Sequence, residues 1–353
     1  MNFRLLLIGF WLLSVSLGAE ELVVGGPFAV NVTHDTATIG WVVQNGEVRD
    51  ANGRLQPVLR GEHMTLNGLK PGETRSYVLP NGTEGSFKVP PTGATSFTAV
   101  IFGDTRSRHE LHRQIVAAIT RWSPDFVLHT GDLVANGLDP EQWPLFFDIE
   151  KPLLAQAAFY PALGNHERNS PQFHEFFAIT KPYYSFDWGR AHFTVINTDL
   201  GTAGRDAAAK EVFWEEQKRW MEDDLVKAQS ADFRLVIMHH PPFTAFKKRQ
   251  SENQEVRALV TLWEQYRVTA TFGGHDHNYQ HHLVHGVHHI VTGGGGAPLY
   301  AVDAPIEGLT LKVESIEHYV RLQVEPGKAS VEAVALDGRI LDAFEFRPAA
   351  ANK

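Results

Sequence analysis

Short apolar runs followed at once by residues that can bind metal ions constrain the fold of this chain more than any other feature. Runs of about four to eight apolar residues are typical of strands buried on both faces of a sheet. The runs are Phe97–Phe102, Phe126–His129, Phe159–Leu163, His192–Ile196, Leu235–Met238, Val268–Phe272 and His288–Val291. Helical patterns lie between several of them, as at Leu111, Ile115 and Ile119. Strand–helix alternation predicts an α/β domain.

The polar residues after five of these runs form one candidate metal site. They are Asp104, Asp132, Asn165 with His166, His239 with His240, and His275 with His277. Ligands of open α/β sheets bind outside the carboxyl ends of the strands, so we expect the five loops to converge on one place. Each motif alone has an ordinary structural explanation, since a Gly-Asp pair is usually a turn. Their joint occurrence, each after an apolar run, favours a single site.

The residue types of this set indicate which cations it would bind. Two carboxylates that lie close together repel each other unless a cation lies between them. Oxygen and nitrogen ligands without thiolate, in a chain that has no cysteine, suit zinc, iron or manganese. Two ions roughly 3.5–4 Å apart, bridged by one aspartate, can hold both the attacking and the leaving oxygen of a displacement. We therefore expect two divalent or trivalent metal ions (Fe, Zn or Mn).

The order Gly-Asp-x, Gly-Asp-x-x, Gly-Asn-His-Glu, His-His and Gly-His-x-His, over about residues 97–300, resembles the signature of the calcineurin-like metallophosphoesterases. A β-rich region ahead of it resembles the layout of the purple acid phosphatase branch. The resemblance implies an α/β fold, a four-layer α/β/β/α sandwich, preceded by a small all-β sandwich of the fibronectin III type. It also implies a binuclear-metal hydrolase of phosphate esters, an acid-phosphatase-like phosphomonoesterase that uses a metal-bound hydroxide.

The resemblance also assigns roles to residues of this chain. One metal would be held by Asp104, Asp132 and His277, and the other by Asp132, Asn165, His239 and His275, with Asp132 bridging. His166 would lie beside the substrate phosphate and donate a hydrogen bond or a proton. Because neighbouring strand residues point to opposite faces, we expect His240 to support the ligands rather than to bind the same ion as His239.

Two positions depart from the family pattern at the first metal. Many members carry a histidine two residues after the first Asp, where this chain has Arg106, and arginine has no lone pair to offer. The purple enzymes instead carry a tyrosine three residues after the second Asp, where this chain has Ala135. Water, His109 or His129 are candidates for the missing ligand. Arg106 is a candidate catalytic residue that grips the substrate phosphate, or it turns away to pair with a structural carboxylate.

A run of histidines follows the last motif, at His281, His282, His285, His288 and His289. This run favours a histidine-rich hairpin over a further metal site. His281 falls where relatives often have an arginine, so it is also a candidate to line the substrate cleft.

The chain divides into three predicted regions. Residues 20–92 contain short β-like runs such as Phe28–Val32 and Thr36–Val43, separated by turn pairs, which is typical of a β-sandwich domain. Pro90 to Gly93 reads as a linker. Residues 96–346 form the metallophosphoesterase catalytic domain, and the β-like residues 317–346 should add strands to its sheets.

Residues 1–19 are predicted to be a signal peptide. Arg4 precedes the apolar run Leu5–Leu17, which is too short to span a bilayer comfortably, and the small Ala19 suits a cleavage site. An uncleaved anchor is the alternative. We expect a secreted or periplasmic protein with no stable membrane insertion after signal cleavage. The net charge of −9 argues against a nucleic-acid partner, so the expected partner is a small phosphate-ester substrate.

Two other functions compete with a phosphomonoesterase. A phosphodiesterase of the same fold would use the same residues, because the shape of the cleft decides between monoester and diester. A non-catalytic binding protein with a degenerate metal site is the alternative from a different class. Arg106 and Ala135 are its only support.

Overall fold

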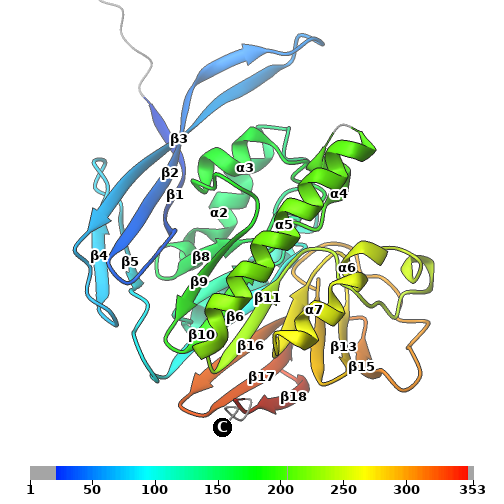
Figure 1. The fold of residues 1–353 in the computed structure, drawn as a ribbon. Coiled ribbons are helices and arrows are strands. Elements are labelled where there is room, and N and C mark those ends of the chain that lie inside the picture. The colour runs from blue at the N-terminus through cyan, green and yellow to red at the C-terminus, as the bar shows by residue number, and fades with distance from the viewer. Residues whose placement is uncertain (1–20, 205, 349–353) are drawn as a thin grey trace, which may run out of the picture.

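The computed structural model describes residues 21–204 and 206–348, where two β-sheets lie face to face between layers of helices (Figure 1). The predicted signal peptide, residues 1–19, lies outside the described residues. Within them the first sheet has nine strands in the order β18-β17-β16-β6-β7-β8-β1-β2-β3. Its strands are β1 (Leu22–Val30), β2 (Thr36–Arg49), β3 (Leu55–Asn67), β6 (Phe97–Phe102), β7 (Phe126–His129), β8 (Ala158–Pro161), β16 (His318–Glu325), β17 (Lys328–Ala335) and β18 (Ile340–Phe346).

The second sheet has seven strands in the same part of the chain, in the order β15-β13-β14-β12-β11-β10-β9. They are β9 (Tyr184–Trp188), β10 (Ala191–Val195), β11 (Phe233–Ile237), β12 (Ala270–Gly273), β13 (Tyr279–Val284), β14 (Val287–Thr292) and β15 (Thr310–Glu314). A separate hairpin consists of β4 (Thr74–Val78) and β5 (Glu84–Lys88). The helices are α1 (His109–Trp122), α2 (Gln142–Leu154), α3 (Pro171–Phe176), α4 (Leu200–Ala203), α5 (Ala207–Lys227), α6 (Gln254–Ala258) and α7 (Val260–Gln265), with 3₁₀ turns η1 (Ala228–Ser230) and η2 (Lys247–Arg249).

Alternating side chains of the central strands build the layers, because successive residues of a strand point to opposite faces. In β6, Ala99 and Ile101 belong to the core between the two sheets. Val100 and Phe102 belong to the core beneath α1 and α2. On the far side α5, α6 and α7 cover the second sheet, around the buried Trp263 (Figure 1). The predicted α/β/β/α fold is therefore confirmed.

The N-terminal region is all-β, as predicted, and its first strand joins it to the large sheet. β1 pairs in parallel with β8 at Ala29 and Ala158, so β1–β3 extend the nine-stranded sheet. Phe28 stacks on Phe147 of α2, with ring centroids 5.2 Å apart. On the opposite face Phe87 of the β4–β5 hairpin shares a core with Ala29. One layer of the small sandwich thus continues into the catalytic domain, and the domain boundary at residue 92 stays a prediction.

The C-terminal strands add to the first sheet, as the sequence indicated. β16 pairs antiparallel with β6, from Val320 opposite Ile101 to Val324 opposite Phe97. β17 pairs with β16, and β18 pairs with β17. These strands place the carboxyl end of β6 well inside the sheet, so the loop after it is held by neighbours on both sides.

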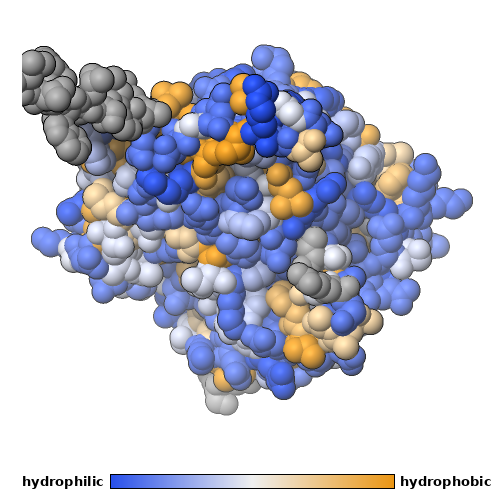
Figure 2. Space-filling model, turned by 90° about the horizontal axis from the view of Figure 1, so that it is seen from above, coloured by the Kyte–Doolittle hydropathy of each residue, from blue (hydrophilic) through white to orange (hydrophobic). Residues whose placement is uncertain are grey.

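The face seen from above in Figure 2 is largely hydrophilic, with separate hydrophobic patches. Exposed large apolar side chains include Val48, Leu55 and Val58 of the long β2–β3 hairpin. Scattered exposed apolar residues are normal for a folded protein. Across the two described segments, we find no helix with the length and apolar character that crossing a membrane requires.

His192 of β10 lies between two carboxylates, away from the candidate ligands. Its Nδ1 is 2.7 Å from Asp187 Oδ1, and its Nε2 is 2.9 Å from Asp224 Oδ2. Burial favours the neutral ring, but the two hydrogen bonds outweigh burial and raise the pKa of His192 to about 9, from 6.5. Because the folded pKa lies above the unfolded one, the charged ring stabilises the fold fully below pH 6.5, and this contribution is lost as pH rises through about 9.

We expect the unfolding free energy of the wild type to fall by about 1–3 kcal/mol more than that of His192→Gln between pH 6 and about 9.5. Denaturant unfolding of both proteins at several pH values measures this difference. The exposed His285, at 69%, supplies the control His285→Gln, which should follow the wild type. Equal pH dependence in the wild type and His192→Gln would show that the charged ring contributes nothing.

Candidate metal centre

Five loops meet at the carboxyl ends of parallel strands, where the sequence predicted them. β6, β7 and β8 run parallel in the first sheet, and β11 and β12 run parallel in the second. They bring together Asp104 after β6, Asp132 after β7, Asn165 and His166 after β8, His239 after β11, and His275 and His277 after β12. Backbone hydrogen bonds tie the loops to one another. Asp104 N–H donates to the Gly131 carbonyl at 2.9 Å, and Gly274 N–H donates to the His239 carbonyl at 2.8 Å.

Three of these residues have backbone angles in the left-handed region. The φ angles are 58° for Asp104, 57° for Asp132 and 67° for His275. Residues other than glycine adopt this region rarely, at a cost in free energy, and such residues gather at functional sites. The turns that aim these side chains inward are therefore held by the surrounding loops, and this supports a functional reason for them.

Four potential ligand atoms lie close together at the second predicted metal position. Asn165 Oδ1 is 3.0 Å from both His239 Nε2 and His275 Nδ1, and these two nitrogens are 3.2 Å apart. Asp132 Oδ1 is 3.3 Å from His239 Nε2. His239 Nδ1 donates to the Thr130 carbonyl at 2.8 Å, so Nε2 presents a lone pair to the oxygens. A cation with bonds of about 2.0–2.2 Å fits this set.

Potential ligand atoms also lie close together at the first predicted metal position. Asp104, Asp132 and His277 each offer one ligand atom, and these atoms lie within 4.8 Å of one another. His277 Nδ1 donates to the Pro298 carbonyl at 2.6 Å, so its Nε2 presents a lone pair to Asp104 Oδ1, 3.3 Å away. Among the described residues this buried oxygen has no hydrogen-bond partner. A buried carboxylate oxygen without a partner is costly unless a cation binds it.

Asp132 contacts both positions. Its Oδ1 faces His239 and accepts the His166 backbone N–H at 3.0 Å. Its Oδ2 lies 3.2 Å from Arg106 Nε and 3.8 Å from His166 Nε2. Burial would raise the pKa of Asp132, but the charges of His239, His166 and Arg106 outweigh burial and lower it. The ionised carboxylate therefore lies within reach of both positions, as a bridging ligand requires.

Arg106 and His166 point to the same side of the site. Arg106 is 14% exposed and contacts Asp132, so it does not turn away from the ligands. His166 Nδ1 donates to the Ala135 carbonyl at 2.7 Å, which leaves Nε2 directed toward Asp132. Both side chains are partly open to solvent. A substrate anion at this opening would meet the Arg106 guanidinium, and it would meet a second donor where His166 carries a hydrogen on both ring nitrogens.

Glu167 is a buried residue of the site whose role the sequence did not reveal. Its Oε2 accepts the backbone N–H groups of Asp132 at 2.9 Å and Gly164 at 2.8 Å, and its Oε1 accepts that of Val134 at 3.2 Å. Burial and the charge of Asp132 raise the pKa of Glu167 to about 8. One carboxylate thus clamps the loop of Asp132 to the loop of Asn165. Only its place in the Gly-Asn-His-Glu motif could have pointed to it.

His240 lies nearer the ligands than the alternation rule indicated. His239, His240 and His275 each offer one ligand atom within 4.8 Å of the others. The ring centroids of His240 and His275 are 4.1 Å apart. The rule fails because β11 ends at Ile237, so His239 and His240 belong to a loop where side chains need not alternate.

Neither His109 nor His129 supplies the missing ligand of the first position. His129 Nδ1 accepts the Gly131 N–H at 3.2 Å, and its Nε2 lies 3.2 Å from Thr105 Oγ1. Neither histidine belongs to a group of candidate ligands in the described residues. In the described residues the first position therefore has three candidate ligands among aspartate, glutamate, cysteine and histidine, namely Asp104, Asp132 and His277.

The histidine run forms the β13–β14 hairpin, as the sequence favoured. His281 Nε2 is 2.7 Å from His288 Nδ1, and His281 Nδ1 is 2.7 Å from Asp342 Oδ2 of β18. His289 Nδ1 lies 2.8 Å from Thr271 Oγ1. Since His281 is 2% exposed and faces β18, it does not line an open substrate cleft.

Tyr300 is a second contact that the sequence did not single out. Its ring stacks on His277, with centroids 4.0 Å apart and planes 21° apart. Its backbone N–H donates to the His277 carbonyl at 3.0 Å. The guanidinium of Arg249 covers the Tyr300 ring at 4.9 Å. This stack fixes the orientation of the His277 ring.

We expect the iron-loaded protein to lack the strong visible absorption of the purple branch. That colour requires a phenolate bonded to iron(III), and Ala135 stands where the branch has its tyrosine. Visible spectra of the iron-loaded wild type and Tyr300→Phe test this. A band present in the wild type and lost in Tyr300→Phe would contradict the expectation and identify Tyr300 as a ligand.

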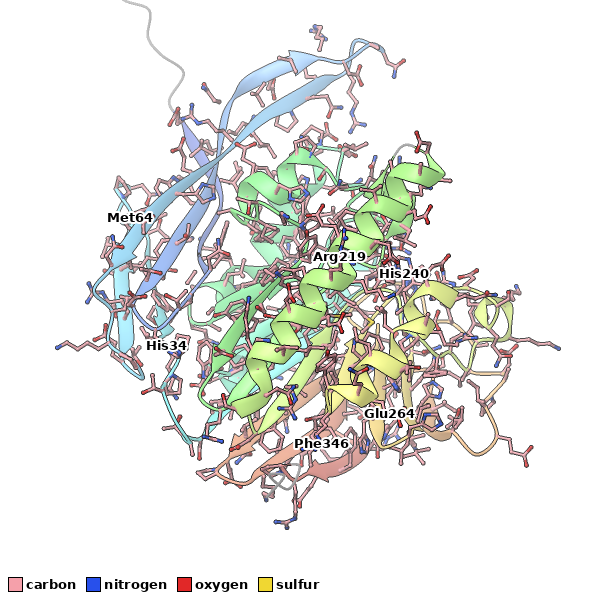
Figure 3. All side chains as sticks on the ribbon, viewed as in Figure 1. His34, Met64, Arg219, His240, Glu264 and Phe346 are labelled. Atoms are coloured by element: carbon pink, nitrogen blue, oxygen red, sulfur yellow. The ribbon has the colours of Figure 1, made fainter. Side chains whose placement is uncertain are left out.

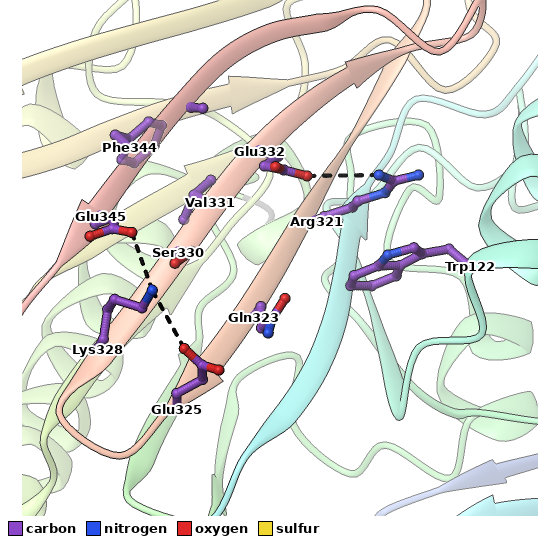
Figure 4. A pocket seen from close by; sticks show the side chains of 11 residues that line it. Trp122, Arg321, Gln323, Glu325, Lys328, Ser330, Val331, Glu332, Phe344 and Glu345 are labelled. Atoms are coloured by element: carbon purple, nitrogen blue, oxygen red, sulfur yellow. Dashed lines mark hydrogen bonds and ion pairs between the residues drawn. The ribbon is translucent and has the colours of Figure 1, made fainter.

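A surface pocket of about 550 Å³ lies elsewhere, on the outer face of β16–β18 beside Trp122 (Figure 4). Ion pairs cross it, from Arg321 to Glu332 and from Lys328 to Glu325 and Glu345. None of the candidate ligands lines it. The candidate site is therefore the ligand cluster rather than this groove.

Comparisons with known proteins agree with this geometry. The model of the calcineurin-like phosphoesterase family matches residues 97–279. "Probable purple acid phosphatase 20" of Arabidopsis thaliana is 25% identical over 62% of this chain and 54% of its own length. "Probable inactive purple acid phosphatase 1" of the same plant is 27% identical over 62% of this chain and 43% of its own length. The chain thus spans about half the length of these relatives.

Solved structures show the same fold. The purple acid phosphatase PPD1 from yellow lupin seeds superposes with a TM-score of 0.73 at 21% identity, over 91% of this chain and 74% of the lupin chain. PhoD superposes with a TM-score of 0.66 at 11% identity, over 91% of this chain and 89% of its own. Both matches span the N-terminal strands as well as the two large sheets, given their coverage.

Proposed function

Because the chain belongs to the calcineurin-like phosphoesterase family, we propose that it is a binuclear-metal hydrolase of small phosphate esters. The single observation that supports this most is the arrangement of ligand atoms around Asp132. Lone pairs of His239 and His277 face carboxylate oxygens at 3.3 Å, and the buried Asp104 Oδ1 has no partner among the described residues. Two cations would satisfy these atoms together.

The chain's own residues have separate tasks in this proposal. Asp104, Asp132 and His277 would hold one ion, and Asp132, Asn165, His239 and His275 would hold the other. Bound ions would lower the pKa of a water molecule and neutralise charge on the phosphoryl group. Arg106 would grip phosphoryl oxygens through its guanidinium. With its Nδ1–H held by the Ala135 carbonyl, His166 would donate from Nε2 to the ester as the imidazolium, which carries a hydrogen on both ring nitrogens.

A phosphomonoesterase is the first choice and a phosphodiesterase the second. One relative that is 27% identical over 50% of this chain is the "Nucleotide pyrophosphatase/phosphodiesterase" of Hordeum vulgare. This relative is the reason to keep phosphodiesterase activity as the second candidate. Others are named inactive, for example the "Probable inactive purple acid phosphatase 1". A non-catalytic metal-binding protein is therefore the outcome to exclude by experiment.

Hydrolysis of p-nitrophenyl phosphate and bis(p-nitrophenyl) phosphate by the purified protein tests the proposal. We expect faster turnover of the monoester, loss of turnover after dialysis against a chelator, and recovery on adding zinc, manganese or iron. Faster turnover of the diester would select the second choice. Two bound ions without turnover of either ester would make the protein a non-catalytic member of its family.

Arg106→Ala should lower kcat/KM for the preferred ester by about ten- to a hundredfold, with metal content the same or higher. Removing one charged hydrogen-bond partner costs about 1.5–3 kcal/mol. The loss of a cation 3.2 Å from Asp132 should also favour metal binding. Steady-state kinetics and metal analysis measure both effects.

Arg113→Ala is the matched control, because Arg113 pairs on the surface with Asp148, outside the site. It should leave kcat/KM unchanged. An unchanged kcat/KM in Arg106→Ala, with unchanged stability, would exclude Arg106 as a substrate clamp.

A further inference from the structure

His240 lies beside the second candidate metal position without belonging to its tight group of atoms. The four atoms of Asp132, Asn165, His239 and His275 are linked by distances of 3.0 to 3.3 Å. The nearest ring nitrogen of His240 lies within 4.8 Å of those of His239 and His275. In the described residues it makes no hydrogen bond to them. His240 is therefore a neighbour of this group that no hydrogen bond joins to it in the described residues.

The loop after β10 fixes the orientation of the His240 ring. Thr198 Oγ1 accepts the His240 backbone N–H at 2.8 Å and lies 3.2 Å from Nδ1 of the same residue. The Thr198 hydroxyl can donate its hydrogen to Nδ1, and the ring hydrogen then lies on Nε2. The opposite tautomer would present a lone pair at Nε2 and make His240 a metal ligand.

Nε2 of His240 has no hydrogen-bond partner in the part of the chain that the structure describes. The residue is 9% exposed, and Nε2 is not among the buried atoms that lack a partner, so this nitrogen is not fully enclosed by the protein. In His240, which is labelled in Figure 3, Nε2 is therefore the ring nitrogen that is left for a ligand.

We propose that His240 is a phosphate-binding residue, whose Nε2–H donates to a phosphoryl oxygen lying beside His275. This rests on the proposed function, since it names a further contact for the same phosphate ester. His240 would hold one side of the phosphoryl group, and Arg106 and His166 would hold the side next to Asp132. Thr198 is then a positioning residue, because it acts only through the ring of His240.

Calorimetric binding of inorganic phosphate to the metal-loaded protein tests this without turnover. His240→Ala should weaken phosphate binding by about ten- to a hundredfold, with the number of bound metal ions unchanged. His240→Gln, whose amide N–H can still donate, should bind more tightly than His240→Ala. Thr198→Val should fall between the wild type and His240→Ala. The exposed His285 provides the control His285→Ala, which should bind phosphate like the wild type.

Three results would overturn the proposal. They are unchanged phosphate affinity in His240→Ala, loss of a metal ion in that variant, and no phosphate binding by the metal-loaded wild type. Loss of a metal ion would make His240 a ligand instead. The proposed function fails separately: a protein that hydrolyses no ester, but loses phosphate affinity in His240→Ala, keeps this proposal. If the wild type hydrolyses esters and His240→Ala keeps its phosphate affinity, the proposed function stands and the role of His240 is excluded.

Discussion

Asp132→Asn should lower the turnover of an aryl phosphate by several orders of magnitude and change the unfolding free energy little. Each factor of a thousand corresponds to about 4 kcal/mol in the activation barrier. Asp132 is the residue that belongs to both candidate metal positions. The amide keeps one oxygen, which can still accept the His166 N–H now bonded at 3.0 Å. It removes the negative charge that two cations would share.

Single-turnover and steady-state rates, with metal analysis and denaturant unfolding of the same samples, measure this effect. Asp125→Asn is the matched control. Asp125 precedes the other end of β7 and accepts the Thr98 N–H at 2.8 Å, so the same chemical change falls outside the site. Asp125→Asn should retain turnover. Wild-type rates in Asp132→Asn would exclude Asp132 as a bridging ligand.

Glu167→Ala should weaken both metal binding and the fold. It would leave three buried backbone donors without an acceptor, those of Asp132, Val134 and Gly164. Each unsatisfied buried donor costs about 1–3 kcal/mol, so we expect the unfolding free energy to fall by about 3–5 kcal/mol. Residues that orient ligands typically change metal affinity by about ten- to a hundredfold when they are removed.

Metal titration with a competing chelator and denaturant unfolding of the metal-free protein measure the two effects separately. Glu167→Gln keeps one oxygen as an acceptor and should lie between the wild type and Glu167→Ala, which covers the case in which the alanine variant does not fold. Glu175→Ala is the control, since the Glu175 carboxylate accepts the Gly61 N–H at 2.8 Å and Glu175 belongs to neither group of candidate ligands. Wild-type metal affinity in Glu167→Gln and Glu167→Ala would show that the clamp does not position the ligands.

The fold and the convergence of the ligand loops could be predicted because they follow from local patterns. The apolar run Phe97–Phe102 is β6 to the residue, and Phe126–His129 is β7. A strand buried on both faces must be apolar throughout, and parallel strands bring their carboxyl ends to one edge. The polar residue that follows such a run is therefore placed by the run itself, as Asp104 and Asp132 are.

The contacts that sequence did not reveal depend on loop shape and on pairing between distant segments. Tyr300 reaches His277 only because the loop after β14 folds back over it. The proximity of His240 to His275 depends on β11 ending one residue early. The union of the small sandwich with the large sheet rests on one parallel pairing of β1 with β8, at Ala29. No periodicity in a short segment encodes such a pairing.

The central claim is that one cluster of side chains around Asp132 binds two metal ions and that hydrolysis requires both. The most direct test is to strip the protein of metal, add back one metal in steps, and record bound ions per chain and turnover of p-nitrophenyl phosphate together. The account predicts saturation at two ions per chain, with turnover rising mainly as the second ion binds. Saturation at one ion, or full turnover in the stripped protein, would contradict it.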